Sequence, residues 1–404
     1  MTAHRHRILS RNLTVLMLCS TVLMLCSSVT ACERTRVRGV AAEPGQPIPG
    51  LQDAETGRFL LGKAVFERLV VQEEGLGPLF NADRCSSCHN IPTTGGSGTL
   101  TVTKATRLVA DRCDLLEAEG GDNIQQRATP LLEARGVTRE TIPADATGRA
   151  RIEAPPLYGL GLVQAIAEAE ILRRDDPDDA DGDGISGRVG RDANGHVGRF
   201  SRKADVATIE GFIDTALRFE IGLTTPAHPE EERINGRPLP PGVDPMRDPE
   251  IDDNGIGRLA DYIRFLAPPA REAASAMASD SIRRGGQLFE GLRCHACHSL
   301  SLRTGTGSFP SLSGVEARLY SDLLLHDMGP ALADVCGTNA SPSEWRTSML
   351  WGLRYRGRLM HDGRAADARS AILLHGGEAQ VSRDLFSRLS AAEQTDLLRF
   401  LASL

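Results

Sequence analysis

The spacing of apolar residues predicts a helix at two corresponding places in the chain. Segments 62–70 (GKAVFERLV) and 284–292 (RGGQLFEGL) both have the pattern of a short helix. Each is followed, after a stretch of variable length, by a helix that ends in Phe-Leu-Ala. The chain therefore repeats one helical plan, and the first copy is longer by roughly 75 residues.

The later helix of each copy has its own boundary signals. In the first copy, apolar residues recur at helical spacing from Ile256 to Leu266, and Pro268 ends the helix. In the second copy, Ser390-Ala-Ala-Glu393 is a capping box that opens a helix with an apolar face reaching Leu404. Two helix pairs are therefore expected.

An apolar run of a different kind lies near the N-terminus. Arginines at positions 5, 7 and 11 precede the run Leu13–Val29, in which TVLMLCS occurs twice in tandem. The run ends in Val29-Thr-Ala-Cys32, which resembles a bacterial lipobox. We expect residues 1–31 to be a lipoprotein-type signal peptide, Cys32 to be lipidated, and residues 32–50 to be a tether. Ordinary cleavage and an uncleaved anchor are the alternatives. The expected location is the periplasm, with a lipid anchor as the only membrane attachment.

Composition narrows the class of protein. Hydrophobic residues make up 41% and charged residues 25%, which is typical of a soluble globular protein. The net charge of −7 argues against binding nucleic acid, which requires clustered Lys and Arg. Aromatic residues are only 4%, so aliphatic side chains or a body that is not protein must fill the cores.

Four of the cysteines lie in two identical motifs. Cys85-Ser-Ser-Cys88-His89 and Cys294-His-Ala-Cys297-His298 both read C-x-x-C-H, the attachment pattern of c-type haem. Two thiols on one turn can add to the two vinyl groups of a haem, and the next His then ligates the iron. A zinc ribbon would need its cysteine pairs within about 20 residues of each other. The sequence therefore predicts two covalently bound haems.

A helix before the haem motif and a helix packed near the end of the copy form the plan of a class I cytochrome c. The predicted fold is mainly α, with two such domains, the first carrying a large polar loop insertion. The N-terminal domain is expected at 51–269, a linker poor in bulky residues at 270–279, and the C-terminal domain at 280–404.

Further motifs support a family resemblance that covers the chain from about Phe59 to its end. They are GLGPLFN at 75–81, PLYGLGLV at 156–163, YSDLLLHDMG at 320–329, EWRT at 344–347, HDGR at 361–364 and HGGE at 375–378. Together they resemble the di-haem oxidoreductase family, also called thiol oxidoreductases. This family is similar to the bacterial di-haem cytochrome c peroxidases. The resemblance implies two haems, a periplasmic location, often an interdomain calcium, and peroxide-linked chemistry.

The insertion contains an acidic loop at 175–187. Asp179, Asp181 and Asp183 alternate before Gly184, a pattern that suits Ca²⁺ with its preference for oxygen ligands. An EF-hand loop would need Glu at position 190, where this chain has Gly190. We expect one bound Ca²⁺, and the alternative is a solvated acidic loop.

The distal side of the first haem is expected to be open. Besides His89, the first domain offers only His196, His228 and Met246, all in the polar insertion. An iron without a protein sixth ligand binds water or peroxide, and peroxide cleavage needs an acid-base group. By resemblance to the peroxidases, the segment 162–172 supplies the catalytic candidates, which are Gln164, Glu168 and Glu170. A solvated helix face is the alternative.

The second iron has several candidate sixth ligands. They are His326, Met328, Met349, Met360, His361 and His375. The segment at 370–377 resembles the peroxidase segment that carries an axial Met, and here the matching position is His375. We expect His298/His375 ligation, and a Met ligand is the alternative.

Four other residues have expected roles beside the haems or between the domains. Arg364 is expected to pair with a haem propionate, and a structural turn is the alternative. Cys113 and Cys336 are left over, so an interdomain disulfide is one outcome and two free thiols the other. Where relatives commonly read Phe-Gly-Trp-Lys-Ala, this chain has Phe-Ser-Arg-Lys-Ala with Arg202 in place of Trp. Electrons would then pass by Trp345, by Trp351 or directly between the haems.

These features predict an exported di-haem c-type oxidoreductase of the cytochrome c peroxidase type. Hydrogen peroxide would be reduced at the N-terminal haem with electrons relayed by the C-terminal haem. The expected electron donor is a small cytochrome or cupredoxin, or a quinol-linked chain. The alternatives are a pure electron-transfer cytochrome without substrate and a peroxide-dependent oxidase of a protein or organic substrate.

Overall fold

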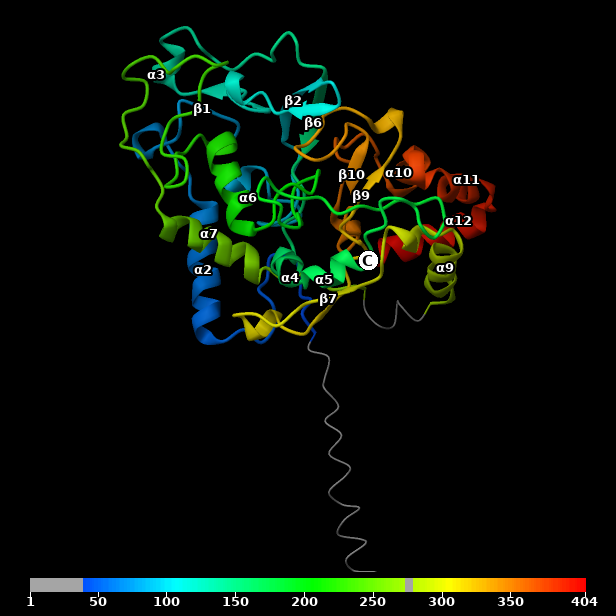
Figure 1. Ribbon diagram of the computed structural model, residues 1–404. Helices are drawn as coiled ribbons and strands as arrows, with labels where there is room; N and C mark the ends of the chain where they lie inside the picture. The colour runs from blue at the N-terminus through cyan, green and yellow to red at the C-terminus, as the bar shows by residue number, and fades with distance from the viewer. Residues whose placement is uncertain (1–38, 273–278) are drawn as a thin grey trace, which may run out of the picture. The chain divides into compact units, whose positions relative to one another are not determined.

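The computed structural model of the chain describes residues 39–272 and 279–404 (Figure 1). The expected signal peptide and the lipidation site Cys32 lie outside the described residues, as does most of the expected linker. The helices are α2 (Asp53–Glu67), α3 (Pro130–Glu133), α4 (Leu160–Ala165), α5 (Glu168–Leu172), α6 (Ile209–Ala216), α7 (Asp253–Phe265), α9 (Asp280–Gly291), α10 (Ala368–Leu374), α11 (Gln380–Arg388) and α12 (Ala391–Ala402). The strands are β1 (Leu79–Phe80), β2 (Thr101–Val109), β3 (Arg112–Asp114), β4 (Asn123–Ile124), β5 (Arg127–Ala128), β6 (Gly148–Glu153), β7 (Leu302–Arg303), β8 (Glu316–Ala317), β9 (Leu325–Asp327) and β10 (Glu344–Arg346).

Helices α2 and α7 form the first packed pair (Figure 1). Phe66 of α2 lies with its ring centroid 4.9 Å from that of Tyr262 in α7, and both side chains are buried. Gly62 lets the helices approach closely, since an added Cβ would collide with the Arg258 carbonyl oxygen. The Asp252 side chain caps α7 by accepting a hydrogen bond from the Gly255 amide at 2.8 Å.

Helices α9 and α12 form the second pair and reproduce the first. Phe289 lies with its ring centroid 5.4 Å from that of Phe400. Gly285 stands four residues before Phe289, as Gly62 stands before Phe66, and a Cβ on it would meet the Asp396 carbonyl oxygen. Ser390 and Glu393 make the predicted capping box at the start of α12. Helices are present at all four expected places, but the first spans Asp53–Glu67 and so begins and ends earlier than the expected 62–70.

An antiparallel sheet, which lies between α2 and α7 along the chain, was not anticipated. Strand β2 pairs with β6 from Thr101 opposite Glu153 to Thr106 opposite Gly148, and it also pairs with β3 and β4. Thr and Val dominate the start of β2, which favours an extended strand. The sheet occupies part of the region that sequence analysis described as a polar loop insertion.

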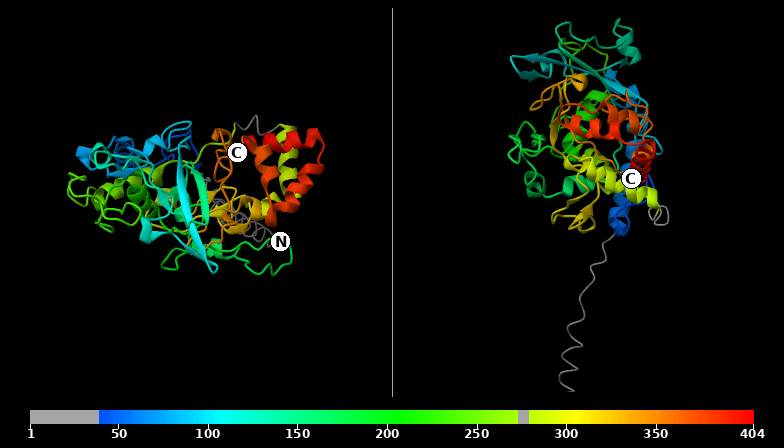
Figure 2. Two further views of the ribbon diagram at one scale, coloured as in Figure 1. Left: turned by 90° about the horizontal axis from the view of Figure 1, so that it is seen from above. Right: turned by 90° about the vertical axis from the view of Figure 1, so that its right-hand side faces the viewer.

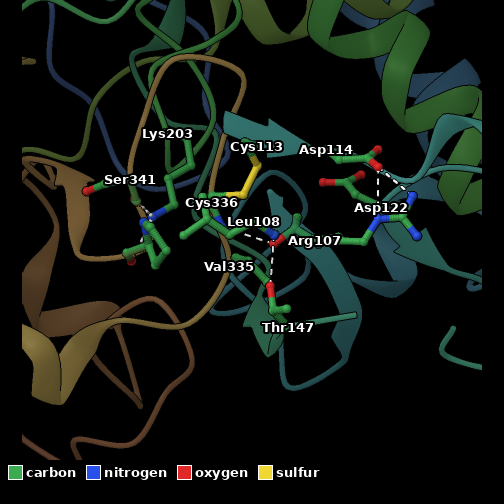
Figure 3. Close-up of a disulfide and its surroundings, with 12 residues drawn as sticks. Arg107, Leu108, Cys113, Asp114, Asp122, Thr147, Lys203, Val335, Cys336 and Ser341 are labelled. Atoms are coloured by element: carbon green, nitrogen blue, oxygen red, sulfur yellow. Dashed lines mark hydrogen bonds and ion pairs between the residues drawn. A yellow bond between two sulfur atoms is a disulfide. The ribbon is translucent and has the colours of Figure 1, made fainter. Parts of the chain in front are cut away.

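A disulfide joins this sheet to the second half of the chain (Figure 3). Cys113 of β3 is bonded to Cys336, and the Cα atoms are 5.7 Å apart. Beside it, Arg107 of β2 pairs with Asp114, and the backbone amide of Cys336 donates to the Thr106 hydroxyl at 3.1 Å. Of the two outcomes left open for these cysteines, the structure therefore contains the disulfide.

The two halves also share backbone bridges and one core. Ile166 pairs with Thr304, and Arg188 pairs with Leu325. The largest core cluster includes Tyr262 from the first half and Leu323 from the second. Figure 2 shows the helix pairs from two further sides. The domain boundaries at 269 and 280 stay a prediction. Within residues 39–272 and 279–404, no helix has the length and apolar character needed to span a bilayer.

Candidate functional site

The first C-x-x-C-H motif folds into a tight turn directly after β1. The amides of Cys88 and His89 both donate to the Cys85 carbonyl at 3.2 Å, which brings the two thiols and the imidazole to one side. Burial raises the pKa of both thiols to about 12. The His89 Nδ1 atom lies 3.1 Å from the Gly96 carbonyl oxygen, and burial lowers the pKa of the imidazole. His89 is therefore neutral, with Nδ1 as the donor to Gly96 and Nε2 as the nitrogen that would ligate iron, and the Pro155 carbonyl also lies near the ring.

The second motif repeats this arrangement after α9. The amide of His298 donates to the Cys294 carbonyl at 2.9 Å, and His298 Nδ1 lies 3.0 Å from the Tyr320 carbonyl oxygen. Burial lowers the pKa of His298 to about 4, and the nearby His375 lowers it further. Burial raises the pKa of Cys294 to about 12. This imidazole is also neutral, and its Nε2 is available.

Both donor sets fit a c-type haem. Each offers two adjacent thiols and one neutral imidazole whose orientation is fixed by a backbone carbonyl, as a proximal ligand requires. Both histidines lie deep in the protein yet keep part of their surface uncovered. Cys85, Cys88 and His89 would hold one haem, and Cys294, Cys297 and His298 the other.

His375 ends α10 and faces the second motif. Its Nδ1 lies 2.7 Å from the Ala371 carbonyl oxygen, one turn earlier in the helix, and burial lowers the pKa of the ring. Its Nε2 is free in the same way as those of His89 and His298. Among the charged groups that affect His298, His375 contributes to lowering its pKa.

The other histidines of the second half have carboxylate partners. His326 lies between Asp322, 2.9 Å from Nε2, and Glu378, 2.7 Å from Nδ1, and these partners raise the pKa of its ring. His361 Nε2 lies 2.6 Å from an Asp334 carboxylate oxygen, and its ring stacks on Trp345 with centroids 3.8 Å apart. The nitrogens that could ligate iron are occupied, which leaves His375 as the most available imidazole.

The methionine candidates lie in apolar packing. Met328 packs beside the cluster of Trp345, Met349 against the large shared core, and Met360 against the core of α9 and α12.

The candidate ligands of the first half lie at the surface. The His196 side chain is 68% exposed and lies 3.1 Å from an Asp192 oxygen. His228 is 45% exposed and lies 2.9 Å from an Asp214 oxygen, and Met246 is 41% exposed. Their positions agree with an iron in the first half that lacks a sixth ligand from this half of the chain.

The three catalytic candidates differ in their surroundings. Gln164 Oε1 accepts a hydrogen bond from the Ile209 amide at 2.8 Å, so this side chain anchors α6. Glu170 pairs with Arg173 and Arg174. Glu168, at the start of α5, is exposed and accepts no side-chain hydrogen bond from the described residues. It lies near Arg199, whose buried Nε has no partner among those residues.

The arginines of the site divide into exposed and buried ones. Arg364 is exposed, pairs with Asp362 at 2.6 Å and donates to the Ala331 carbonyl at 3.0 Å. Arg202, Arg346 and Arg356 lie deep in the protein, and sequence reasoning did not connect them. Two features of the sequence could have pointed to these arginines: Arg202 stands where relatives have Trp, and Arg346 lies in the EWRT segment.

The acidic loop brings together a different set of carboxylates from the expected Asp179, Asp181 and Asp183. Carboxylate oxygens of Asp176, Asp179 and Asp181 lie within 4.8 Å of one another, whereas Asp183 pairs with Arg293 at 2.6 Å. The Asp179 carboxylate accepts from the Gly184 amide at 3.1 Å, a local turn contact.

A second group of carboxylates escaped sequence reasoning because its members are spread over twenty residues. It consists of Glu231, Asp244, Asp248 and Glu250.

With this geometry, the chain can be placed among known proteins. It belongs to the family described as "di-haem oxidoreductase, putative peroxidase", whose profile matches residues 132–404. Membership makes the protein a di-haem oxidoreductase, and the family implies two haems. The matched span contains the second C-x-x-C-H motif and begins after the first.

Solved structures with similar folds were also found. The di-haem peroxidase BthA from Burkholderia thailandensis is 16% identical, covers 89% of this chain and 86% of its own, and has a TM-score of 0.41. A MauG-like protein associated with microbial copper homeostasis is 17% identical, with coverages of 91% and 93% and a TM-score of 0.40. Kuenenia stuttgartiensis hydrazine synthase is 15% identical, with coverages of 90% and 95% and a TM-score of 0.38. A comparison with curated proteins found no match.

Proposed function

We propose that this protein is an exported c-type di-haem enzyme that reduces hydrogen peroxide at its N-terminal haem, with electrons relayed by the C-terminal haem. The observation that carries the proposal is the difference between the halves in available iron ligands. His375 faces His298, whereas His196, His228 and Met246 lie at the surface. One closed iron and one open iron suit an electron relay and a peroxide site respectively.

Two cytochrome c-like domains with covalent haems are part of this proposal. The equivalent helix pairs, each with a Gly four residues before a buried Phe, support a duplicated domain. The four thiols and two neutral imidazoles support covalent attachment and proximal ligation. A haem iron with an open position supplies the electron transfer and the binding site for peroxide.

Glu168 is the acid-base group we favour. Peroxide reduction needs a side chain that takes a proton from one oxygen and delivers it to the other. Gln164 and Glu170 already have partners in the protein, and Glu168 does not. Arg199, whose buried Nε has no partner among the described residues, lies near Glu168.

The setting of the enzyme follows from the sequence. We propose a periplasmic lipoprotein anchored through Cys32, which receives electrons from a small cytochrome, a cupredoxin or a quinol-linked chain. The lipobox-like segment and the preceding apolar run support this location. The disulfide supports an oxidising compartment.

The decisive experiment is an EPR spectrum of the oxidised holoprotein before and after hydrogen peroxide is added. The proposal expects one high-spin ferric signal that peroxide consumes and one low-spin signal. Two low-spin signals that do not respond to peroxide would contradict it and favour a pure electron-transfer cytochrome.

We also propose that the acidic loop binds one Ca²⁺, as its alternating carboxylates suggest. The position of Asp176 near Asp179 and Asp181 supports a cation at these three residues. Elemental analysis of holoprotein purified with calcium should find one equivalent, and Asp179→Asn with Asp181→Asn should remove it. Absence of calcium from the unmodified holoprotein would contradict the site.

A further inference from the structure

Three arginine side chains meet in the interior between the two haem motifs. Arg202 comes from the loop after Phe200, Arg346 ends β10, and Arg356 follows the turn Leu353–Tyr355. Burial lowers the pKa of Arg202 to about 9, and the positive charges of Arg356 and Arg346 contribute. Burial lowers the pKa of Arg346 to about 10, and Arg356 again contributes. The positive charges of Arg356 and Arg346 therefore act on Arg202, and the charge of Arg356 acts on Arg346.

The three side chains differ in how far their hydrogen-bonding capacity is used. Arg346 donates to the Ser201 carbonyl at 2.9 Å and to the Thr347 carbonyl at 3.2 Å. Arg202 reaches the Glu153 carbonyl at 3.3 Å and the Ser348 hydroxyl at 3.5 Å, which are long distances, and its buried Nε has no partner among the described residues. The Arg356 side chain is half-buried, and none of its nitrogens is among the buried polar atoms left without a partner. The unpartnered Nε of Arg202 is costly to bury.

The nearby carboxylates compensate these charges only in part, because Asp362 and Asp322 each have another cation and Glu153 alone acts on both Arg202 and Arg356. Asp362 pairs with Arg364 at 2.6 Å, and Asp322 lies 2.9 Å from His326 Nε2. Glu153 lies 3.8 Å from Arg358, and burial raises the pKa of its carboxyl group. A surplus of positive charge therefore remains in the interior.

The cluster lies between the two haem motifs. Arg202 contacts Glu153, and two residues further on the Pro155 carbonyl meets the His89 ring. The Arg202 carbonyl accepts a hydrogen bond from the Arg346 amide at 2.9 Å. The charge of Asp322 acts to raise the pKa of Arg346. The Asp322 amide in turn donates a hydrogen bond to the Cys297 carbonyl at 2.9 Å. One continuous set of contacts thus links the guanidinium groups to both motifs.

We propose that Arg202, Arg346 and Arg356 form a single anion site that binds haem propionate carboxylates. A guanidinium fork matches a carboxylate in shape and charge, and each haem carries two propionates. The site differs from the sequence expectation, which assigned a propionate to the exposed Arg364. It rests on the two haems, which the family establishes, and on attachment at the two motifs, and it does not depend on peroxide reduction.

The arginines also raise the reduction potential of the haem they hold. A free propionate is negative and stabilises the ferric iron, so a guanidinium that neutralises it favours the ferrous form. The test is spectroelectrochemistry of holoprotein with Arg202→Gln, Arg202→Lys and Arg356→Gln. Arg283→Gln is the matched control, because Arg283 is 60% exposed and pairs with Asp280 at the surface.

We expect Arg202→Gln and Arg356→Gln to lower the midpoint potential of one haem and to shift its propionate band in resonance Raman spectra. Arg202→Lys should give a smaller shift, and the control should give none. Arg356→Gln loses no hydrogen bond to the described residues, so it tests the site even if Arg202→Gln folds poorly. Covalent haem content, measured by mass, should stay at two in each variant.

A second experiment distinguishes a haem propionate from a small anion taken from solution as the ligand of this site. If the site takes a small anion from solution, adding acetate or phosphate will change the thermal midpoint of the wild-type holoprotein, and Arg202→Gln will abolish that change. Such a dependence without a shift of the propionate band would overturn the proposal. Unchanged potentials and bands in both glutamine variants that retain two haems would also overturn it.

Discussion

At the scale of single residues, the partner of each imidazole nitrogen decides what a histidine can do. His89, His298 and His375 each direct Nδ1 to a backbone carbonyl, which leaves Nε2 as a lone-pair donor. His326 and His361 instead hold carboxylates at Nε2. The first group suits metal ligation, and the second suits charge pairing.

The expected role of His375 gives a spectroscopic prediction. His375→Ala should convert the second haem from low-spin to high-spin, because the imidazole facing His298 is lost. The wild-type oxidised protein should lack the weak near-infrared band of a sulfur ligand. EPR and near-infrared absorption check both points, with the surface variant His196→Ala as control. A low-spin second haem in His375→Ala, with a sulfur band, would transfer the role to a methionine.

Glu168 gives a kinetic prediction. Glu168→Gln should lower kcat for peroxide by roughly 10²-fold while leaving the haem spectra unchanged, because an acid-base group typically contributes that much. Glu170→Gln is the matched control, since that carboxylate already pairs with two arginines. Steady-state peroxide assays decide the matter, and equal activity of both variants would remove Glu168 from the mechanism.

The sequence identifies candidate residues more readily than their contacts. The C-x-x-C-H motifs name six side chains because the chemistry fixes their spacing. The resemblance of segment 370–377 favoured His375, but the pattern could not show why His326 and His361 are less available, since the difference lies in partners such as Asp322, Asp334 and Ala371. It also could not predict that Arg202, Arg346 and Arg356 converge, because that depends on long-range folding.

At the scale of elements, the loop that carries Glu231 and Glu250 is sensitive to pH. Burial raises the pKa of Glu231 to about 9, and the charges of Glu250, Asp244 and Asp248 raise it further. A carboxyl group whose pKa is higher in the folded state stabilises that state while it is protonated. Its contribution is complete below its ordinary pKa of 4.5 and is lost as the pH rises through about 9.

We therefore expect the thermal midpoint to fall between about pH 5 and pH 9 in buffer with EDTA. Glu231→Gln should weaken this fall and raise the midpoint at pH 8, because it removes the buried charge. The neighbouring Glu230→Gln should behave as wild type, since Glu230 is exposed. A wild-type midpoint that rises with pH over this range would show that Glu231 ionises normally.

Helices and strands differed in how far the sequence predicted them. The packed helices have long apolar periods and clear caps such as Asp252 and Ser390, so local sequence specifies them. The sheet of β2, β3, β4 and β6 consists mostly of short strands in a polar stretch, and its pairing joins Thr101 to Glu153 across fifty residues. Such pairing depends on tertiary contacts that local patterns do not reveal.

At the scale of the whole molecule, the disulfide ties the sheet to the second half. Replacing both Cys113 and Cys336 by Ser removes a cross-link between positions 223 residues apart. The chain-entropy relation gives an upper value of about 5 kcal/mol for a loop of this length.

We expect the double variant to unfold at lower temperature by several degrees and to keep two haems. Calorimetry and mass spectrometry check these points, and Ser341→Ala near the same segment is a control that leaves the bond intact. An unchanged melting temperature would mean that the other contacts between the halves dominate.

Because of this disulfide, the order in which the cysteines are oxidised matters for the folding of this chain. The described cysteines comprise one oxidised pair and four thiols, and only a thiol can add to a haem vinyl group. A non-selective oxidant would close each C-x-x-C pair first, because its sulfurs are neighbours, whereas Cys113 meets Cys336 only after distant segments have come together. With the proposed covalent attachment, maturation would require an oxidant for one pair and a reductant that returns the other four sulfurs to thiols before haem arrives.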